Sequence, residues 1–310
     1  MPSTTLSLRC RAALAATTAG GLLICLAAGP NLARADENLL GYIKGAETLP
    51  AGAMDAYETL TYRADKGHGT YRAFDSSTEI EYGITDRLMG SVSLKAQSIK
   101  TEGLLIDAYI PKDERYGLRP AGIGALVKYN FLKPALDPIG LAATFGFDYS
   151  WLDPHSGQDK DTFSFETGLQ AQKFFLDDQL VWLGNLGIEA TIAKRDEVSN
   201  LPEDFEWPTT EEMEIEFTAG TGLSYRFAPN WFIGAEVLYQ VERETEVAIE
   251  RWSVQAGPSV HYGSRRWWAT LTWLPQLAGG GGIFPEQDDK NLHLIEKTKQ
   301  EVRLKFGYNF

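Results

Sequence analysis

Charged side chains stand at alternate positions along much of the chain, and they offer the main chemistry of the sequence. A period of two between polar and apolar residues places such charges on one face of a β-strand. Carboxylates gathered around a pore attract cations, so the set predicts a pore that favours cations or polar solutes. The alternative is a structural network of ion pairs that fills a narrow barrel. The residues expected to face this interior are Asp75, Glu79, Glu81, Lys95, Lys128, Asp148, Glu166, Glu189, Glu214, Glu216, Arg226, Glu236, Glu242, Glu301, Arg303 and Lys305.

Ser259 and His261 share a strand face with one residue between them. A serine hydrolase needs a base within reach of a hydroxyl, so this pair is a candidate for nucleophilic catalysis. The alternation, however, places both side chains on the polar, interior face, and no flanking motif supports catalysis. We therefore expect no enzyme, and a lipid hydrolase is the least favoured function.

Metal and cofactor sites are not expected either. His68, His155 and His293 are scattered over connections without the spacing of metal ligands. The chain also lacks a phosphate-binding loop or a dinucleotide fingerprint. Pairs of acidic residues in polar connections match no cation-binding loop, so a solvated acidic surface is the better interpretation. These pairs are Asp196-Glu197, Glu203-Asp204, Glu211-Glu212 and Asp288-Asp289.

The elements that must position the charges are strands. Amphipathic segments with alternating residues recur along the chain, and their number is even, as antiparallel outer-membrane barrels require. We therefore predict an all-β fold, a 12-stranded antiparallel up-and-down transmembrane β-barrel. Its strands are expected near 54–64, 70–83, 87–97, 121–131, 139–151, 162–175, 180–193, 211–227, 231–242, 251–262, 267–275 and 298–310.

Short and long connections alternate between these strands. Short turns rich in Gly, Pro, Asn and Asp, such as Phe227–Trp231, follow aromatic residues and fit periplasmic turns. Leu277–Phe284 holds four consecutive glycines, and we favour a flexible outer loop over a segment that folds inward. The longer connections, which fit extracellular loops, are Asp65–Gly69, Ser98–Arg119, Leu152–Asp161, Lys194–Thr210, Arg243–Glu250 and Gln276–Asn291.

One face of each strand should meet lipid. Strands 139–151 and 211–227 each separate an aromatic and aliphatic face from a polar one. A charge near the middle of the lipid face costs about 2–4 kcal/mol for Arg or Lys and less for Asp or Glu. Strand 54–64 is the exception, because Glu58 falls among apolar residues. We expect Glu58 to turn inward, which would put Tyr57 and Thr59 outside.

The last residues, 302–310, alternate up to a terminal aromatic. Phe306, Tyr308 and Phe310 share the apolar face with Val302 and Leu304. This ending resembles the closing strand of Gram-negative outer-membrane barrels, which the barrel-insertion machinery recognises. The resemblance implies that Phe306, Tyr308 and Phe310 form an assembly signal.

The first 35 residues fit a cleaved secretory signal peptide, with Arg9 and Arg11 ahead of an apolar run. Cys10 and Cys25 are the two cysteines of the chain and both lie there. Residues 36–53 then precede the barrel of residues 54–310, either as a plug in the lumen or as a periplasmic segment. The net charge of −13 argues against a nucleic-acid partner.

The stretch from Tyr57 through Lys66–Tyr71 to Glu81–Leu88 resembles an uncharacterised family of Gram-negative outer-membrane β-barrel proteins. The turn Tyr82–Leu88 is also similar to barrels associated with aromatic-degradation pathways, which are presumed to import substrates. The resemblance implies an outer-membrane location and a barrel fold. It assigns no binding or catalytic residue in this chain.

These observations favour an outer-membrane channel or passive transporter for small solutes. The alternative is a non-conducting barrel with a structural or surface-interaction role. The expected partners are outer-membrane lipid, the insertion machinery and a small solute. The solute and the oligomeric state are left open by the sequence.

Overall fold

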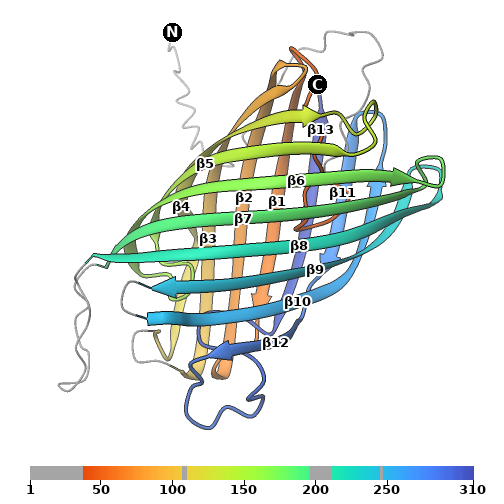
Figure 1. The fold of residues 1–310 in the computed structure, drawn as a ribbon. Helices are drawn as coiled ribbons and strands as arrows, with labels where there is room; N and C mark the ends of the chain where they lie inside the picture. The colour runs from red at the N-terminus through yellow and green to blue at the C-terminus, as the bar shows by residue number, and fades with distance from the viewer. Residues whose placement is uncertain (1–37, 107–109, 196–210, 245–246) are drawn as a thin grey trace, which may run out of the picture. The chain divides into compact units, whose positions relative to one another are not determined.

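The computed structural model describes residues 38–106, 110–195, 211–244 and 247–310 (Figure 1). The predicted leader and the acidic pairs Asp196-Glu197 and Glu203-Asp204 lie outside these ranges. Within the described residues, no helix is long and apolar enough to span a membrane.

Antiparallel strands form one closed sheet, and β1 pairs with β13 to complete the ring (Figure 1). Strands β11 and β12 both pair with β10 and are two parts of one wall strand, interrupted at Leu274 and Pro275. The predicted 12-stranded antiparallel barrel is therefore confirmed. The strands are β1 (Met54–Ala64), β2 (His68–Thr85), β3 (Leu88–Leu105), β4 (Glu114–Leu132), β5 (Gly140–Leu152), β6 (Asp159–Phe175), β7 (Leu180–Arg195), β8 (Glu212–Ala228), β9 (Trp231–Glu244), β10 (Val247–Gly263), β11 (Trp267–Trp273), β12 (Gln276–Gly281) and β13 (Gln300–Asn309).

The connections divide into two ends of the barrel. At the turn end, β2 and β3 are joined by two residues, as are β8 and β9, and the barrel begins and ends there, at Met54 and Asn309. Asn230 adopts a left-handed backbone (φ 69°), which Asn tolerates better than most residues. The opposite end, called the loop end, carries the connections after β1, β3, β5, β7, β9 and β12.

Three predicted loops are wrong in extent. Arg243–Glu250 is mostly strand, because β9 runs to Glu244 and β10 begins at Val247. Ser98–Arg119 is largely a hairpin, because β3 runs to Leu105 and β4 begins at Glu114. Gln276–Asn291 begins with β12, whose glycines allow close packing rather than flexibility. A Cβ on Gly280 would lie 2.4 Å from Nε1 of Trp252, and one on Gly279 would lie 2.4 Å from Oε1 of Gln276.

The two faces of the wall differ as the alternation predicts. Phe145 and Phe217 are exposed on the outer face, whereas Ala142 and Thr144 of the same wall are buried on the inner face. Outward aromatic residues also lie near the turn end, where the tilted rings of Trp231 and Tyr262 are in contact with 4.8 Å between their centroids. The barrel thus presents an apolar outer surface and a polar lumen.

Glu58 contradicts the predicted orientation of the first strand. Tyr57 faces the lumen, where its hydroxyl donates to Glu79 (2.5 Å) and its ring lies 5.5 Å from that of Trp268. Glu58 consequently lies on the outer face. The hydroxyls of Ser76 and Thr78 on β2 donate to its carboxylate at 2.5 and 2.6 Å. These two hydrogen bonds offset part of the cost of an outward charge.

We predict that Glu58→Leu raises the free energy of unfolding by about 1 kcal/mol, because it removes a charge from the apolar outer face. The measurement is urea unfolding of the barrel in lipid vesicles. Tyr57→Leu is the control on the inner face and should lower stability by about 2 kcal/mol. A loss of stability in Glu58→Leu would instead show that the two hydrogen bonds from Ser76 and Thr78 outweigh the cost of the outward charge.

Candidate functional site

Residues 38–53, called the plug segment, enter the lumen from the turn end. Leu40, Ile43 and Ala46 are at most 1% exposed. The sequence left open whether this segment fills the lumen or hangs outside, and the structure places it inside. An extended segment within a barrel needs partners for its backbone, because buried N–H and C=O groups are costly when unpaired.

Glu236 supplies the main anchor. Its Oε1 accepts hydrogen bonds from the backbone N–H of Gly41 (2.8 Å) and from the hydroxyls of Ser259 (2.9 Å) and Thr272 (3.0 Å). Its Oε2 accepts from the N–H groups of Tyr42 (2.8 Å) and Ile43 (2.9 Å). Five donors therefore surround one carboxylate on β9, which compensates for its burial.

Amide side chains hold the next stretch of the plug segment. Asn185 accepts from the backbone N–H of Lys44 and donates to its carbonyl, both at 2.8 Å. Gln172 accepts from the N–H of Ala46 at 2.9 Å, and Asn130 donates to its carbonyl at 2.5 Å. These side chains imitate the pairing that a neighbouring strand would give.

The apolar side chains of the plug segment occupy a socket in the wall. Leu39, Leu40 and Ile43 form a buried cluster with Val181 and Leu183 of β7. Glycines on β8 and β9 make room for this cluster. A Cβ on Gly220 would lie 2.1 Å from Ile43 Cδ1, and one on Gly222 would lie 2.3 Å from Leu40 Cδ1.

Charged residues predicted for the lumen also contact the plug segment. The guanidinium of Arg303 lies 3.7 Å from the ring centroid of Tyr42, whose hydroxyl donates to Glu301 at 2.7 Å. Lys128 donates to the carbonyl of Gly45 at 2.7 Å. Lys305 donates to Asn38, the first described residue.

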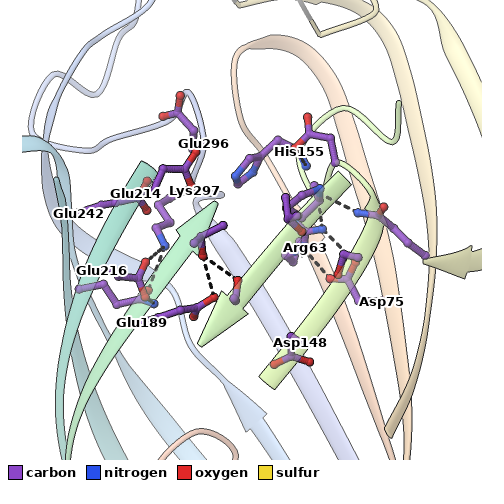
Figure 2. Close-up of a pocket in the computed structure, with 18 of the residues that line it drawn as sticks. Arg63, Asp75, Asp148, His155, Glu189, Glu214, Glu216, Glu242, Glu296 and Lys297 are labelled. Atoms are coloured by element: carbon purple, nitrogen blue, oxygen red, sulfur yellow. Dashed lines mark hydrogen bonds and ion pairs between the residues drawn. The ribbon is translucent and has the colours of Figure 1, made fainter. Parts of the chain in front are cut away.

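Between the plug segment and the loop end lies a cavity of about 1040 Å³. Thirteen carboxylates and six Lys or Arg side chains line it, so negative charge prevails. Figure 2 shows Glu189, Glu214, Glu216 and Glu242 around Lys297 on one side of this cavity. The predicted interior residues that line the cavity are Asp75, Lys95, Asp148, Glu166, Glu189, Glu214, Glu216, Glu242, Glu301 and Arg303.

The remaining predicted residues lie elsewhere. Glu79 and Glu81 accept hydrogen bonds from Tyr57, while Lys128, Glu236 and Lys305 hold the plug segment. Arg226 is exposed near the turn end of β8 and does not line the cavity.

Four carboxylates form a continuous row around part of the wall. Glu166 on β6 pairs with Glu189 on β7, Glu189 pairs with Glu216 on β8, and Glu216 pairs with Glu242 on β9. We call Glu166, Glu189, Glu216 and Glu242 the carboxylate row. Like charges on directly opposite residues repel each other, so the row attracts cations.

Protein cations neutralise part of the row. Lys297 donates to Glu216 at 3.2 Å, and Arg251 pairs with Glu242. Elsewhere in the cavity Arg63 binds Asp75 at 2.6 Å, and Lys95 pairs with Asp148. The lumen therefore combines a network of ion pairs with an excess of carboxylates.

In the connection after β12, residues 282–299, the last part reaches the cavity, where Glu296, Lys297 and Thr298 line the wall. Phe284, Leu292 and Leu294 of this connection form a buried cluster, and the N–H of Gly67 donates to the carbonyl of Leu294 at 3.1 Å. Lys66, in the connection after β1, is wholly buried, with its amine 4.6 Å from the ring centroid of Tyr71. Burial lowers the pKa of Lys66 to about 7. The connections after β1 and β12 thus pack against each other at the loop end.

Ser259 and His261 lie inside the barrel and are at most 1% exposed. Ser259 donates to Glu236, and Nδ1 of His261 lies 2.8 Å from Oγ1 of Thr270, which itself donates to the carbonyl of Asn38. Their hydrogen bonds thus serve the wall around the plug segment. Among the described residues, no group of His, Cys, Asp or Glu is arranged to hold a metal ion.

Sequence reasoning missed the amides and the apolar socket that receive the plug segment. Val181 and Leu183 break the rule that inward positions are polar, and this break in β7 indicates an apolar group in the lumen. Asn185 and Gln172 looked like ordinary lumen residues, because their partners are far away in the chain.

The C-terminal aromatics lie where the sequence predicts. Phe306 and Phe310 are exposed on the outer face, and the N–H of Phe310 donates to the carbonyl of Met54 at 3.0 Å. Tyr308 packs edge to face against Phe310, with 5.0 Å between the ring centroids. Recognition of these residues by an insertion machinery stays a prediction.

The fold is shared with solved outer-membrane barrels. An outer-membrane channel from Pseudomonas putida F1 has 13% identity and a TM-score of 0.59, over 86% of this chain and 98% of that one. The β-domain of the Bordetella autotransporter BrkA has 12% identity and a TM-score of 0.51, over 84% of this chain and 100% of that one. No curated protein matches the sequence significantly. The family model described as "Family of unknown function (DUF6662)" matches residues 32–310.

We predict that Glu236→Ala releases the plug segment from the wall. Three backbone N–H groups would lose their acceptor, at a cost of about 3 kcal/mol, or roughly 100-fold in local opening. Hydrogen exchange at residues 38–46 measures this opening. Glu216→Ala is the control, because Glu216 is a lumen carboxylate that accepts from Gln240 and Lys297 and not from this segment. Unchanged exchange in Glu236→Ala would show that the anchor is not Glu236.

Proposed function

The chain belongs to DUF6662, a family of unknown function, and from this premise we propose that it is an outer-membrane β-barrel that passes small polar solutes, preferentially cations. The carboxylate row beside the cavity is the observation that carries this proposal. A Gram-negative outer membrane is its proposed location.

The outer face supports this location. Its exposed aliphatic and aromatic side chains suit hydrocarbon, and the polar side chains turn inward. In this membrane the turn end faces the periplasm and the loop end faces outward, as the difference in connection length indicates. The cleaved leader at residues 1–35 stays a prediction.

The lumen supports passage. The cavity is large enough for hydrated ions and small solutes, and its wall is rich in carboxylates. Negative charge in a cavity with low-dielectric walls raises the local concentration of cations. The four adjacent carboxylates of the carboxylate row therefore favour cations over anions in this part of the lumen, where Lys297 pairs with Glu216.

The plug segment makes passage conditional. It occupies the periplasmic side of the lumen and is held by polar groups at several levels. We infer that solutes pass beside this segment or when it yields.

A non-conducting barrel is the second candidate. The same plug segment and the ion pairs of Arg63 and Lys297 favour it, since all of them lie in the lumen and are held by the wall. A lipid hydrolase is the weakest candidate, because Ser259 and His261 are buried in the lumen. The predicted association with aromatic-degradation pathways stays a prediction.

We predict single-channel currents from the purified protein in planar bilayers, with a reversal potential that shows cation preference under a salt gradient. Glu166→Gln combined with Glu189→Gln should lower the cation-to-anion permeability ratio by about two-fold or more. Glu102→Gln combined with Glu114→Gln is the matched control, because those carboxylates do not line the cavity.

Absence of current in both the wild type and the Glu236→Ala variant would contradict passage and favour the non-conducting barrel. Equal selectivity in the Glu166→Gln, Glu189→Gln variant and the wild type would contradict the role of the carboxylate row.

A further inference from the structure

Three cations form a row on the outer face near the loop end. Arg72 on β2 pairs directly with Lys100 on β3, and Lys100 pairs directly with Arg115 on β4. We call Arg72, Lys100 and Arg115 the cationic row. Arg72 and Arg115 are exposed, and the side chain of Lys100 is 41% exposed.

This arrangement is unfavourable without an anion. Like charges on directly opposite residues of neighbouring strands destabilise a sheet. Glu102 pairs with Lys100 at 2.9 Å and also attracts Arg72, but exposed pairs of this kind contribute little. Glu114 lies beside Arg115 in sequence, and its carboxylate accepts the backbone N–H of Arg115. An excess of positive charge remains, in a chain whose net charge is −13.

The cationic row borders a groove in the outer face. The groove has a volume of about 370 Å³, and its lining combines the three cations with Tyr62, Phe74 and Leu118. Tyr62 and Leu118 are 40% and 60% exposed. A ligand for this groove has anionic oxygens at one end and an apolar part at the other.

The depth of the cationic row fits a membrane surface. On β2, ten residues separate Arg72 from Tyr82, an outward aromatic near the turn end. Ten residues span about 33 Å along a strand, or about 25 Å along the barrel axis at a tilt near 40°. This height matches the apolar band of outer-membrane barrels. Arg72 therefore lies at headgroup level when Tyr82 lies at the opposite interface.

We propose that the cationic row binds the phosphate groups of a phosphorylated glycolipid in the outer leaflet, with an acyl chain against Tyr62 and Phe74. This inference goes beyond solute passage and rests on the proposed outer-membrane location. Guanidinium groups suit phosphate because they donate two parallel hydrogen bonds, and Lys100 adds a compact charge between them.

The test is native mass spectrometry of the full-length processed barrel, purified in detergent. The probes are bisphosphorylated lipid A, zwitterionic phosphatidylethanolamine and inorganic phosphate. We expect lipid A to bind about ten-fold more tightly than phosphatidylethanolamine, since each charge-assisted contact adds 1 kcal/mol or more. The variant Arg72→Gln, Lys100→Gln, Arg115→Gln should lose this preference.

The matched control replaces Lys194, Arg243 and Lys290 with Gln, because these exposed cations also lie near the loop end but form no row. It should bind lipid A like the wild type, and faster migration of unboiled samples on a detergent gel verifies that each variant is folded. The proposal would be overturned if the control lost as much lipid A binding as the row variant, or if the row variant bound lipid A like the wild type. Complete displacement of lipid A by millimolar inorganic phosphate would indicate a free-anion site and overturn it too.

The binding assay uses purified protein and needs no conduction. If the protein failed to bind lipid A, the single-channel currents and the location in the outer-membrane fraction would still be expected. Loss of the outer-membrane location would instead appear in cell fractionation.

Discussion

One carboxylate organises the lumen. Glu236 accepts hydrogen bonds from three consecutive backbone N–H groups of the plug segment and from two hydroxyls of the wall. Without it, a buried segment of chain would leave several donors unpaired, each at a cost of about 1–3 kcal/mol. The position of Glu236 sets the depth at which Leu40 and Ile43 meet their glycine-lined socket. The floor of the acidic cavity follows from that depth.

The wall obeys a second constraint, since an apolar surrounding excludes charge from the outer face. The charged residues of the strands therefore turn inward in the apolar band. In the lumen the carboxylates outnumber the Lys and Arg side chains that could pair with them. Glu58 departs from this rule and needs two hydroxyls to do so. The cationic row departs from it only at the loop end, where headgroups replace hydrocarbon.

Much of the fold was predictable, because strand alternation and the parity of connections are local properties of the chain. Parity alone placed Glu189, Glu216 and Arg303 in the lumen. Glu58 was not predictable, since its environment is set by Ser76 and Thr78 on a neighbouring strand. The glycines of β12 led to a wrong loop prediction for a related reason. Glycine occurs both in flexible loops and where backbones pack closely, and here it allows close packing against Trp252. The plug segment depends on Glu236, nearly two hundred residues away, and no local pattern records that contact.

The central claim is that residues 38–46 of the plug segment occupy the lumen of the folded barrel, whereas Ala51 lies at its turn end. Residues 36–310 lack cysteine, so a single cysteine at Ala46→Cys can be compared with one at Ala51→Cys. Ala46 is fully buried and Ala51 is exposed. In the folded protein, a maleimide reagent should label position 46 at least about 100-fold more slowly than position 51, and unfolding should remove the difference. Equal labelling rates in the folded barrel would contradict the plugged lumen.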